Sequence, residues 1–253
     1  MSRHPCDLRA LACAGAVFGV IAFAGCGGDD EPTTSSAESS TTSTSTEEAE
    51  TDDNGFPVNA YVQPDLGVVP DGIELDGREG TPPPEPSEKD VKKAAEAAGC
   101  ELETGLPDEG STHLPDEDAA DVDYKTDPPT SGDHYGNPSE ILSGALADGA
   151  YLETPPIGRA VHALEHQRVA IQYSPDLSEE DQLALKGVFD SDPPGVLFYP
   201  NSEMGPEVAV AAWTNLLSCE GYEGDATLDA IQAFRDEFRG NPDAGPEPVP
   251  LDL

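Results

Sequence analysis

Positive charge is scarce in this chain of 253 residues. Lysine and arginine number 12 together against 51 aspartates and glutamates, which gives a formal net charge of -39 at pH 7. The acidic residues are spread from Asp29 to Asp252 rather than confined to one tail. Recognition of nucleic-acid phosphates needs a basic surface, so we expect no nucleic-acid partner. The acidity favours solubility and attraction for cations.

Apolar residues are also few, at 36%, and aromatic residues make up only 6%. These values are low for a chain that is globular throughout. The stretch PTTSSAESSTTSTSTEEAETDD contains no aromatic residue and cannot bury enough apolar surface to offset the entropy of ordering. Residues 26–55 are therefore predicted to form a disordered tether.

The longest apolar run, LACAGAVFGVIAFAG, is short for a membrane span and is typical of a signal peptide. It ends in F-A-G-C, which resembles the bacterial lipobox. Residues 1–25 are thus predicted to be a lipoprotein signal peptide, with Cys26 as the lipidated first residue of the mature chain. We expect an extracytoplasmic protein anchored to a bacterial membrane by that lipid. The alternative is an uncleaved membrane anchor.

Cysteine is limited to five residues. Cys6 and Cys13 lie in the predicted signal peptide and Cys26 would carry lipid, which leaves Cys100 and Cys219. Two thiols in an oxidising compartment predict a disulfide. A thiolate metal ligand at either position is the less favoured alternative.

The remaining chain predicts a single small α+β domain over residues 87–248, with a mixed or antiparallel sheet and a few short helices. A Pro- and Gly-rich arm, 56–86, precedes it and a tail, 249–253, follows.

Helices are predicted from Ser87 to Gly99, over 178–189 with Ser178 as the N-cap, and over 226–240. Strands are predicted at 168–173, 195–200 and 207–213.

The main functional signal is a concentration of histidine. Of five histidines, His4 lies in the signal peptide, and His113, His134, His162 and His166 fall within about fifty residues of one another. His162 and His166 frame the sequence HALEH. On a helix, residues four apart share a face with Cβ atoms about 6 Å apart, so both imidazoles can reach one metal.

On a strand the same two residues would stand about 13 Å apart, too far to chelate easily. A metal site therefore requires a helical turn before the strand at 168–173, and we expect that turn to start at about Arg159. His134 lies in a turn-rich loop, where Asp133 or Asp127 could orient its ring. The alternative is that these histidines serve packing only.

The order of several further residues resembles the bacterial family catalogued as domain of unknown function 3105. The similarity covers roughly residues 100 to 248, and PPTSGDHY together with VHALEH carries most of its specificity. The residues concerned are His113, Val122, Tyr124, Pro128 to Tyr135, Gly149, Tyr151, Val161 to His166, Tyr173, Pro175, Leu177, Ala212, Trp213, Phe234, Phe238 to Gly240, Pro246 and Glu247.

The resemblance implies a secreted or membrane-tethered protein and a shared histidine-lined site, because all four mature histidines coincide with family positions. It implies no settled activity. The family pattern usually has glycine where this chain has Gln167.

Three functions remain open. The preferred hypothesis is a non-catalytic metal site of His113, His134, His162, His166 and Glu165 that buffers or delivers copper or zinc. A zinc hydrolase would instead use His162 and His166 as ligands and Glu165 as general base. The third is a structural or interaction module of the cell envelope, with an unknown protein partner.

The chain has no G-x-S-x-G elbow, phosphate loop or dinucleotide fingerprint. Convergence of the ring nitrogens to within about 4 Å would favour metal, whereas rings that are scattered or bonded to backbone carbonyls would favour the structural role.

Overall fold

The structure is a computed structural model that describes residues 51, 57–63, 67–115, 119–136, 144–242, 245–249 and 251. Its main feature is a seven-stranded sheet with strand order β1-β5-β7-β6-β8-β9-β2. Strands β5, β7 and β6 run parallel, and the other pairs are antiparallel, so the predicted mixed α+β architecture is confirmed. The strands are β1 (Val62–Gln63), β2 (Glu101–Thr104), β5 (Asp148–Ala150), β6 (Val169–Tyr173), β7 (Val196–Pro200), β8 (Val208–Ala212) and β9 (Asn215–Cys219).

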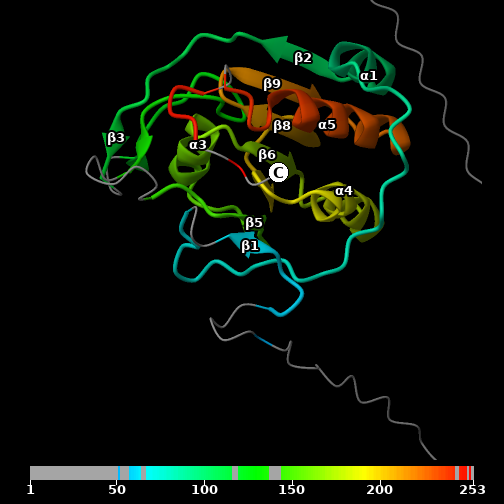
Figure 1. The fold of residues 1–253 in the computed structure, drawn as a ribbon, viewed down its shortest axis with the longest axis horizontal. Coiled ribbons are helices and arrows are strands. Elements are labelled where there is room, and N and C mark those ends of the chain that lie inside the picture. Colours follow the sequence, from blue (N-terminus) through cyan, green and yellow to red (C-terminus); the bar gives the residue numbers. More distant parts are fainter. Residues whose placement is uncertain are drawn as a thin grey trace, which may run out of the picture. The chain divides into compact units, whose positions relative to one another are not determined.

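Helices cover both faces of this sheet (Figure 1). They are α1 (Val91–Ala98), α3 (Ile157–Glu165), α4 (Glu179–Ser191) and α5 (Asp225–Phe238). Alternate residues of each strand point to opposite faces. Val169 and Ile171 of β6 therefore pack in one hydrophobic cluster with α1, α4 and α5, whereas Ala170 packs in a second cluster with α3.

Capping residues show where local sequence decides the helix ends. Ser178 caps α4 and accepts a hydrogen bond from Asp181 N, as predicted. Gly99 ends α1 in the left-handed conformation that favours glycine, with φ 68°. The prediction of Ser87 as the N-cap of α1 is wrong. Asp90 caps that helix, and Ser87 instead donates its backbone N–H and hydroxyl to the Asp229 carboxylate.

Part of the Pro- and Gly-rich arm packs against the sheet. Its strand β1 pairs with β5, and Leu75 is only 3% exposed. The predicted signal peptide and Cys26 lie outside the described residues, as does the predicted tether apart from Thr51. Among the helices that the structure describes, none is long and apolar enough to cross a membrane.

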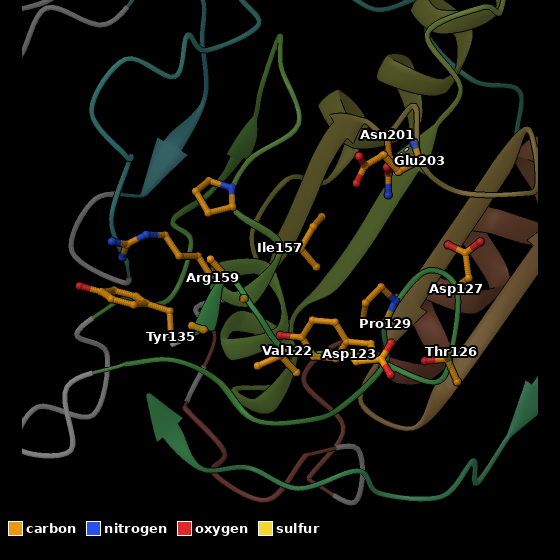
Figure 2. Close-up of a pocket in the computed structure, with 15 residues that line it drawn as sticks. Val122, Asp123, Thr126, Asp127, Pro129, Tyr135, Ile157, Arg159, Asn201 and Glu203 are labelled. Carbon is orange, nitrogen blue, oxygen red and sulfur yellow. Dashed lines mark hydrogen bonds between the residues drawn. The ribbon is translucent and has the colours of Figure 1, made fainter. Parts of the chain in front are cut away.

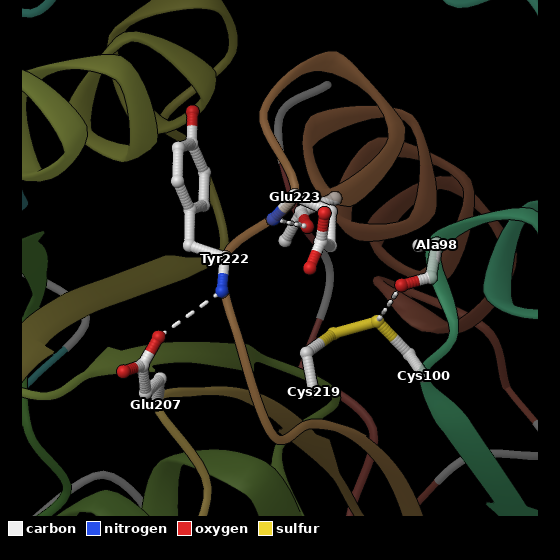
Figure 3. The surroundings of a disulfide bond; sticks show 7 residues. Ala98, Cys100, Glu207, Cys219, Tyr222 and Glu223 are labelled. Carbon is white, nitrogen blue, oxygen red and sulfur yellow. Dashed lines mark hydrogen bonds between the residues drawn. A yellow bond between two sulfur atoms is a disulfide. The ribbon is translucent and has the colours of Figure 1, made fainter.

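A disulfide joins Cys100 to Cys219, which confirms the predicted pairing (Figure 3). Cys100 follows the end of α1, and Cys219 is the last residue of β9. The bond thus ties the α1 end to the sheet where β2 pairs with β9. Because both sulfurs are bonded to each other, neither serves as a thiolate ligand for a metal.

Helix α3 packs on the opposite face of the sheet from the disulfide. It carries most of HALEH and precedes β6, so the structure has helix at the point where the metal hypothesis requires it. The helix begins at Ile157, two residues before the predicted start at Arg159, with Pro156 at the N-cap. Proline is favoured at a helix start because its fixed φ suits the first turn.

Candidate metal centre

The end of α3 sets the position of the HALEH side chains. His162 and Glu165 lie within the helix, and His166 is its C-cap with φ -90°. Gln167 follows with φ 67°, the left-handed conformation that usually falls to glycine at this position. The turn needed to enter β6 is therefore made with glutamine, and its backbone carbonyl accepts a hydrogen bond from Gly240 N.

His113 and His134 come from a separate two-stranded parallel sheet. Its strands are β3 (His113–Leu114) and β4 (His134–Tyr135), and the two histidines are direct partners in the register. Directly opposite residues of neighbouring strands project to the same face. Their ring centroids are 5.0 Å apart.

Strands β3 and β4 and helix α3 bring three imidazoles and one carboxylate together. The His162 ring centroid lies 4.6 Å from that of His113 and 4.7 Å from that of His134. Glu165 Oε2 lies 3.2 Å from His113 Nε2 and 3.0 Å from His134 Nε2. One donor atom from each of the four residues lies within 4.8 Å of the others.

Backbone carbonyls fix the imidazole tautomers. His134 Nδ1 donates to Gly132 O at 2.8 Å, and His162 Nδ1 donates to Tyr135 O at 2.7 Å. A carbonyl can only accept, so each Nδ1 carries the proton, and in the neutral ring Nε2 presents a lone pair. The expectation that Asp133 or Asp127 orients a ring is wrong, because these carboxylates accept hydrogen bonds from Thr112 N and Gly205 N.

The cluster is buried except at His113. His134 and His162 have no exposed surface and Glu165 is 1% exposed, whereas the His113 side chain is 14% exposed. Burial, reinforced by His134, His166 and His113, lowers the pKa of His162 to about 3. Burial opposes ionisation of Glu165, but His134 and His113 together hold its pKa below the usual range. The site therefore favours neutral His162 beside an ionised carboxylate.

His134 Nε2 is the least satisfied atom in the cluster. It is buried 3.0 Å from Glu165 Oε2, and it has no assigned hydrogen-bond partner among the described residues. A neutral imidazole lone pair facing a carboxylate oxygen is repulsive, whereas a shared proton or a metal cation between them is attractive. Buried nitrogens of this kind need an explanation in a folded protein.

His166 lies in a second, neighbouring set. Its Nδ1 donates to Glu247 O at 2.8 Å, and donor atoms of Glu165, His166 and Glu247 all lie within 4.8 Å of one another. The structure thus divides the predicted five-residue site into two sets that share Glu165. Glu247 is a residue that the local sequence did not single out. Only its place in the family pattern pointed to it.

Comparison with known proteins identifies the family. The family described as Protein of unknown function (DUF3105) matches residues 116–250. The chain belongs to this family. No curated protein and no solved structure matches it. Of the residues in the two donor sets of this chain, only His113 lies outside the segment matched by the family.

Gly136 is a second residue of the DUF3105 segment that sequence reasoning missed. A Cβ at this position would lie 2.8 Å from His113 Cδ2 and 3.1 Å from His162 Cε1. A residue with a side chain there would therefore push both rings. Glycine lets the backbone after His134 pass directly beside the imidazoles. The sequence signal for this close approach was the glycine that directly follows His134 and Tyr135.

A pocket of about 700 Å³ lies at the amino end of α3 (Figure 2). Tyr135 and Arg159 form one side of it, with the Arg159 guanidinium 3.7 Å from the Tyr135 ring centroid. Among the residues described, neither Glu165 nor any histidine of the two sets lines this pocket. It therefore does not place a substrate beside the carboxylate that a zinc hydrolase would use as its base.

Other side chains near the donor sets contribute to packing or to hydrogen bonds of the loops. Tyr151 and Met204 lie in the hydrophobic cluster that includes α3. Trp213 lies in the same cluster and meets the His134 ring edge-on, with centroids 6.2 Å apart. Ser131 is buried, and its hydroxyl accepts a hydrogen bond from Glu109 N.

Proposed function

We propose that this protein binds a copper or zinc ion through His113, His134, His162 and Glu165, and that it buffers or delivers the metal without catalysing a reaction. The observation that carries this proposal is His134 Nε2, a buried nitrogen that lies 3.0 Å from Glu165 Oε2 and has no assigned hydrogen-bond partner among the described residues. A cation between these atoms satisfies both.

The donor chemistry supports a borderline metal. Three imidazole nitrogens and one carboxylate oxygen suit Zn²⁺ or Cu²⁺, whereas Mg²⁺ and Ca²⁺ prefer oxygen donors. In a tetrahedral site with bonds of about 2.1 Å, neighbouring donors are about 3.4 Å apart. Glu165 Oε2 already lies 3.0 Å from His134 Nε2 and 3.2 Å from His113 Nε2, and all the donors are within 4.8 Å of one another, so only small shifts are needed on binding. His113, on a two-residue strand and partly exposed, is best placed to move.

The burial and the contacts of the Glu165 carboxylate support a non-catalytic role. A zinc hydrolase needs this carboxylate as a base beside an open coordination position. Here Oε2 already lies within 3.2 Å of two imidazole nitrogens, and the side chain is almost fully buried. Glu165 is therefore better suited to be a ligand than a base.

The proposed location is the outer side of a bacterial membrane, with a lipid on Cys26 as the anchor. The signal-like segment 1–25 and the F-A-G-C sequence support this location. The disulfide between Cys100 and Cys219 agrees with an oxidising compartment. A metal carrier held by a long tether could then meet partners near the membrane surface.

Metal content tests the proposal. The purified chain is stripped with a chelator, offered copper, zinc and nickel in competition, and passed through gel filtration before elemental analysis. Wild type is expected to retain at least one equivalent of copper or zinc. His113→Ala, which removes the most exposed ligand, should lose it, and Thr112→Ala, an exposed neighbour, should retain it. Retention of no metal by wild type would leave the structural module as the better account.

A further inference from the structure

Glu165 is shared by two sets of donors. On one side it meets His113, His134 and His162, and on the other it meets His166 and Glu247. The contacts of Glu165 with His113 and His134 both use the same oxygen, Oε2. A carboxylate has two oxygens, so Oε1 can serve a second ion while Oε2 serves the first.

The distances suit two ions side by side. Metals in dinuclear sites are about 3.5 to 4 Å apart. His162 belongs to the first set and His166 to the second, and their ring centroids are 4.8 Å apart. One turn of helix therefore places one imidazole beside each ion, with Glu165 between them.

The second set is held in place by the main chain around it. His166 Nδ1 donates to the carbonyl of Glu247, so the residue that orients the ring also supplies a carboxylate. Arg168 donates to His166 O at 2.7 Å and is itself fixed by buried Asp148 at 3.1 Å. The carboxyl-terminal segment lies close to α3, since a Cβ on Gly245 would be 2.5 Å from Glu165 O.

We propose that this centre is dinuclear, with Glu165 bridging one ion held by His113, His134 and His162 and a second held by His166 and Glu247. This proposal rests on the proposed function, because the second ion presupposes the first. Two dications repel each other, and the carboxylates of Glu165 and Glu247 offset that repulsion. Glu247 is exposed, so the second ion lies nearer to solvent and binds more weakly. It is the ion that exchanges.

Stoichiometry tests the bridge. The full chain, with the three cysteines outside the disulfide replaced by serine, is stripped and titrated with Zn²⁺ in a calorimeter at a salt concentration that screens the acidic surface. Wild type should bind two equivalents in two steps of different affinity. Glu247→Gln should bind one equivalent and keep the tighter step. Glu220→Gln, an exposed glutamate next to Cys219, should behave as wild type.

Cobalt provides an independent readout. A second equivalent of Co²⁺ should weaken the electron paramagnetic resonance signal of the first through exchange across the shared carboxylate. One equivalent in wild type, or two in Glu247→Gln, would overturn the dinuclear centre and leave the first site intact. Two uncoupled cobalt signals would overturn the bridge. No binding at all would instead contradict the proposed function.

Discussion

His113 and His134 lie directly opposite each other on β3 and β4, with ring centroids 5.0 Å apart. Their approach is set by strand pairing, since His134 N donates to Thr112 O and Gly136 N donates to Leu114 O. The two rings are therefore brought together by backbone hydrogen bonds and not by contact between the imidazoles. The ligand geometry depends on how closely these strands and α3 pack.

Gly136→Ala tests that packing. The added methyl would lie 2.8 Å from His113 Cδ2 and 3.1 Å from His162 Cε1, so both rings must shift. We expect metal affinity to fall about ten- to a hundredfold, which is typical of changes in residues that contact and orient metal ligands. Competition with a chromogenic chelator measures the change. Gly221→Ala is the control, because its Cβ has no contact closer than 3.9 Å. Equal affinities in the two variants would contradict this account of Gly136.

The metal-free protein should lose stability as the pH falls. His162 takes up a proton near pH 6.5 in the unfolded chain and only near pH 3 when folded. Between these values the unfolded state binds more protons, so the free energy of unfolding decreases as the pH falls from about 6.5 to about 3. Urea titrations across this range measure the slope.

A matched variant isolates the contribution of His162. His162→Asn keeps a donor for the Tyr135 carbonyl but cannot be protonated in this range. Its stability should depend less on pH over the window than that of wild type. An identical slope would show that His162 is not the group responsible. The pKa of Glu165 is lowered in the folded protein, so its protonation also reduces the free energy of unfolding as the pH falls. This contribution begins only below about pH 4.5, the ordinary pKa of a glutamate.

Gln167→Gly should stabilise the protein. Gln167 adopts φ 67°, which costs an L-residue about 1 kcal/mol relative to glycine, and its buried Nε2 lacks a hydrogen-bond partner among the described residues. We expect a gain of about 1 kcal/mol and a rise in Tm of about 2 to 4 °C. Scanning calorimetry measures it, with metal content unchanged. A lower Tm would mean that Gln167 contributes more by packing beside Gly245 than its backbone conformation costs.

The disulfide should matter for stability and not for metal. Cys100 and Cys219 are separated by 119 positions, and a loop of this length predicts a loss of about 4 to 5 kcal/mol in the double alanine variant. Guanidinium unfolding of the oxidised protein measures the loss. The bond lies at the β2–β9 edge, in the cluster on the opposite face from α3, so metal stoichiometry should be unchanged. Loss of metal along with stability would contradict this separation.

Much of the fold was predictable because the patterns are local. The run VAIQY and the Ser178 cap of α4 carry their structure in adjacent residues, and both predictions are confirmed. β9, NLLSC, was missed since it follows β8 after only Trp213 and Thr214, without a glycine or proline to mark the turn. Thr214 takes the left-handed conformation there, with φ 56°.

The site was predictable in composition but not in arrangement. The spacing of HALEH predicts a shared helix face, and α3 confirms it. Pairing of His113 with His134 depends on a two-residue parallel bridge, which has no periodicity to detect. Glu247 reaches His166 only because the carboxyl-terminal segment folds back on α3. Ring orientation by the Gly132 and Tyr135 carbonyls is likewise invisible in the sequence, since every residue has a carbonyl.

The most direct test of the central claim is the anomalous scattering of a zinc-loaded crystal at the zinc edge. The account predicts a peak enclosed by the Nε2 atoms of His113, His134 and His162 and the Glu165 carboxylate, at bond lengths of about 2.0 to 2.1 Å. Anomalous peaks confined to the acidic surface, with no peak inside this cluster, would contradict it.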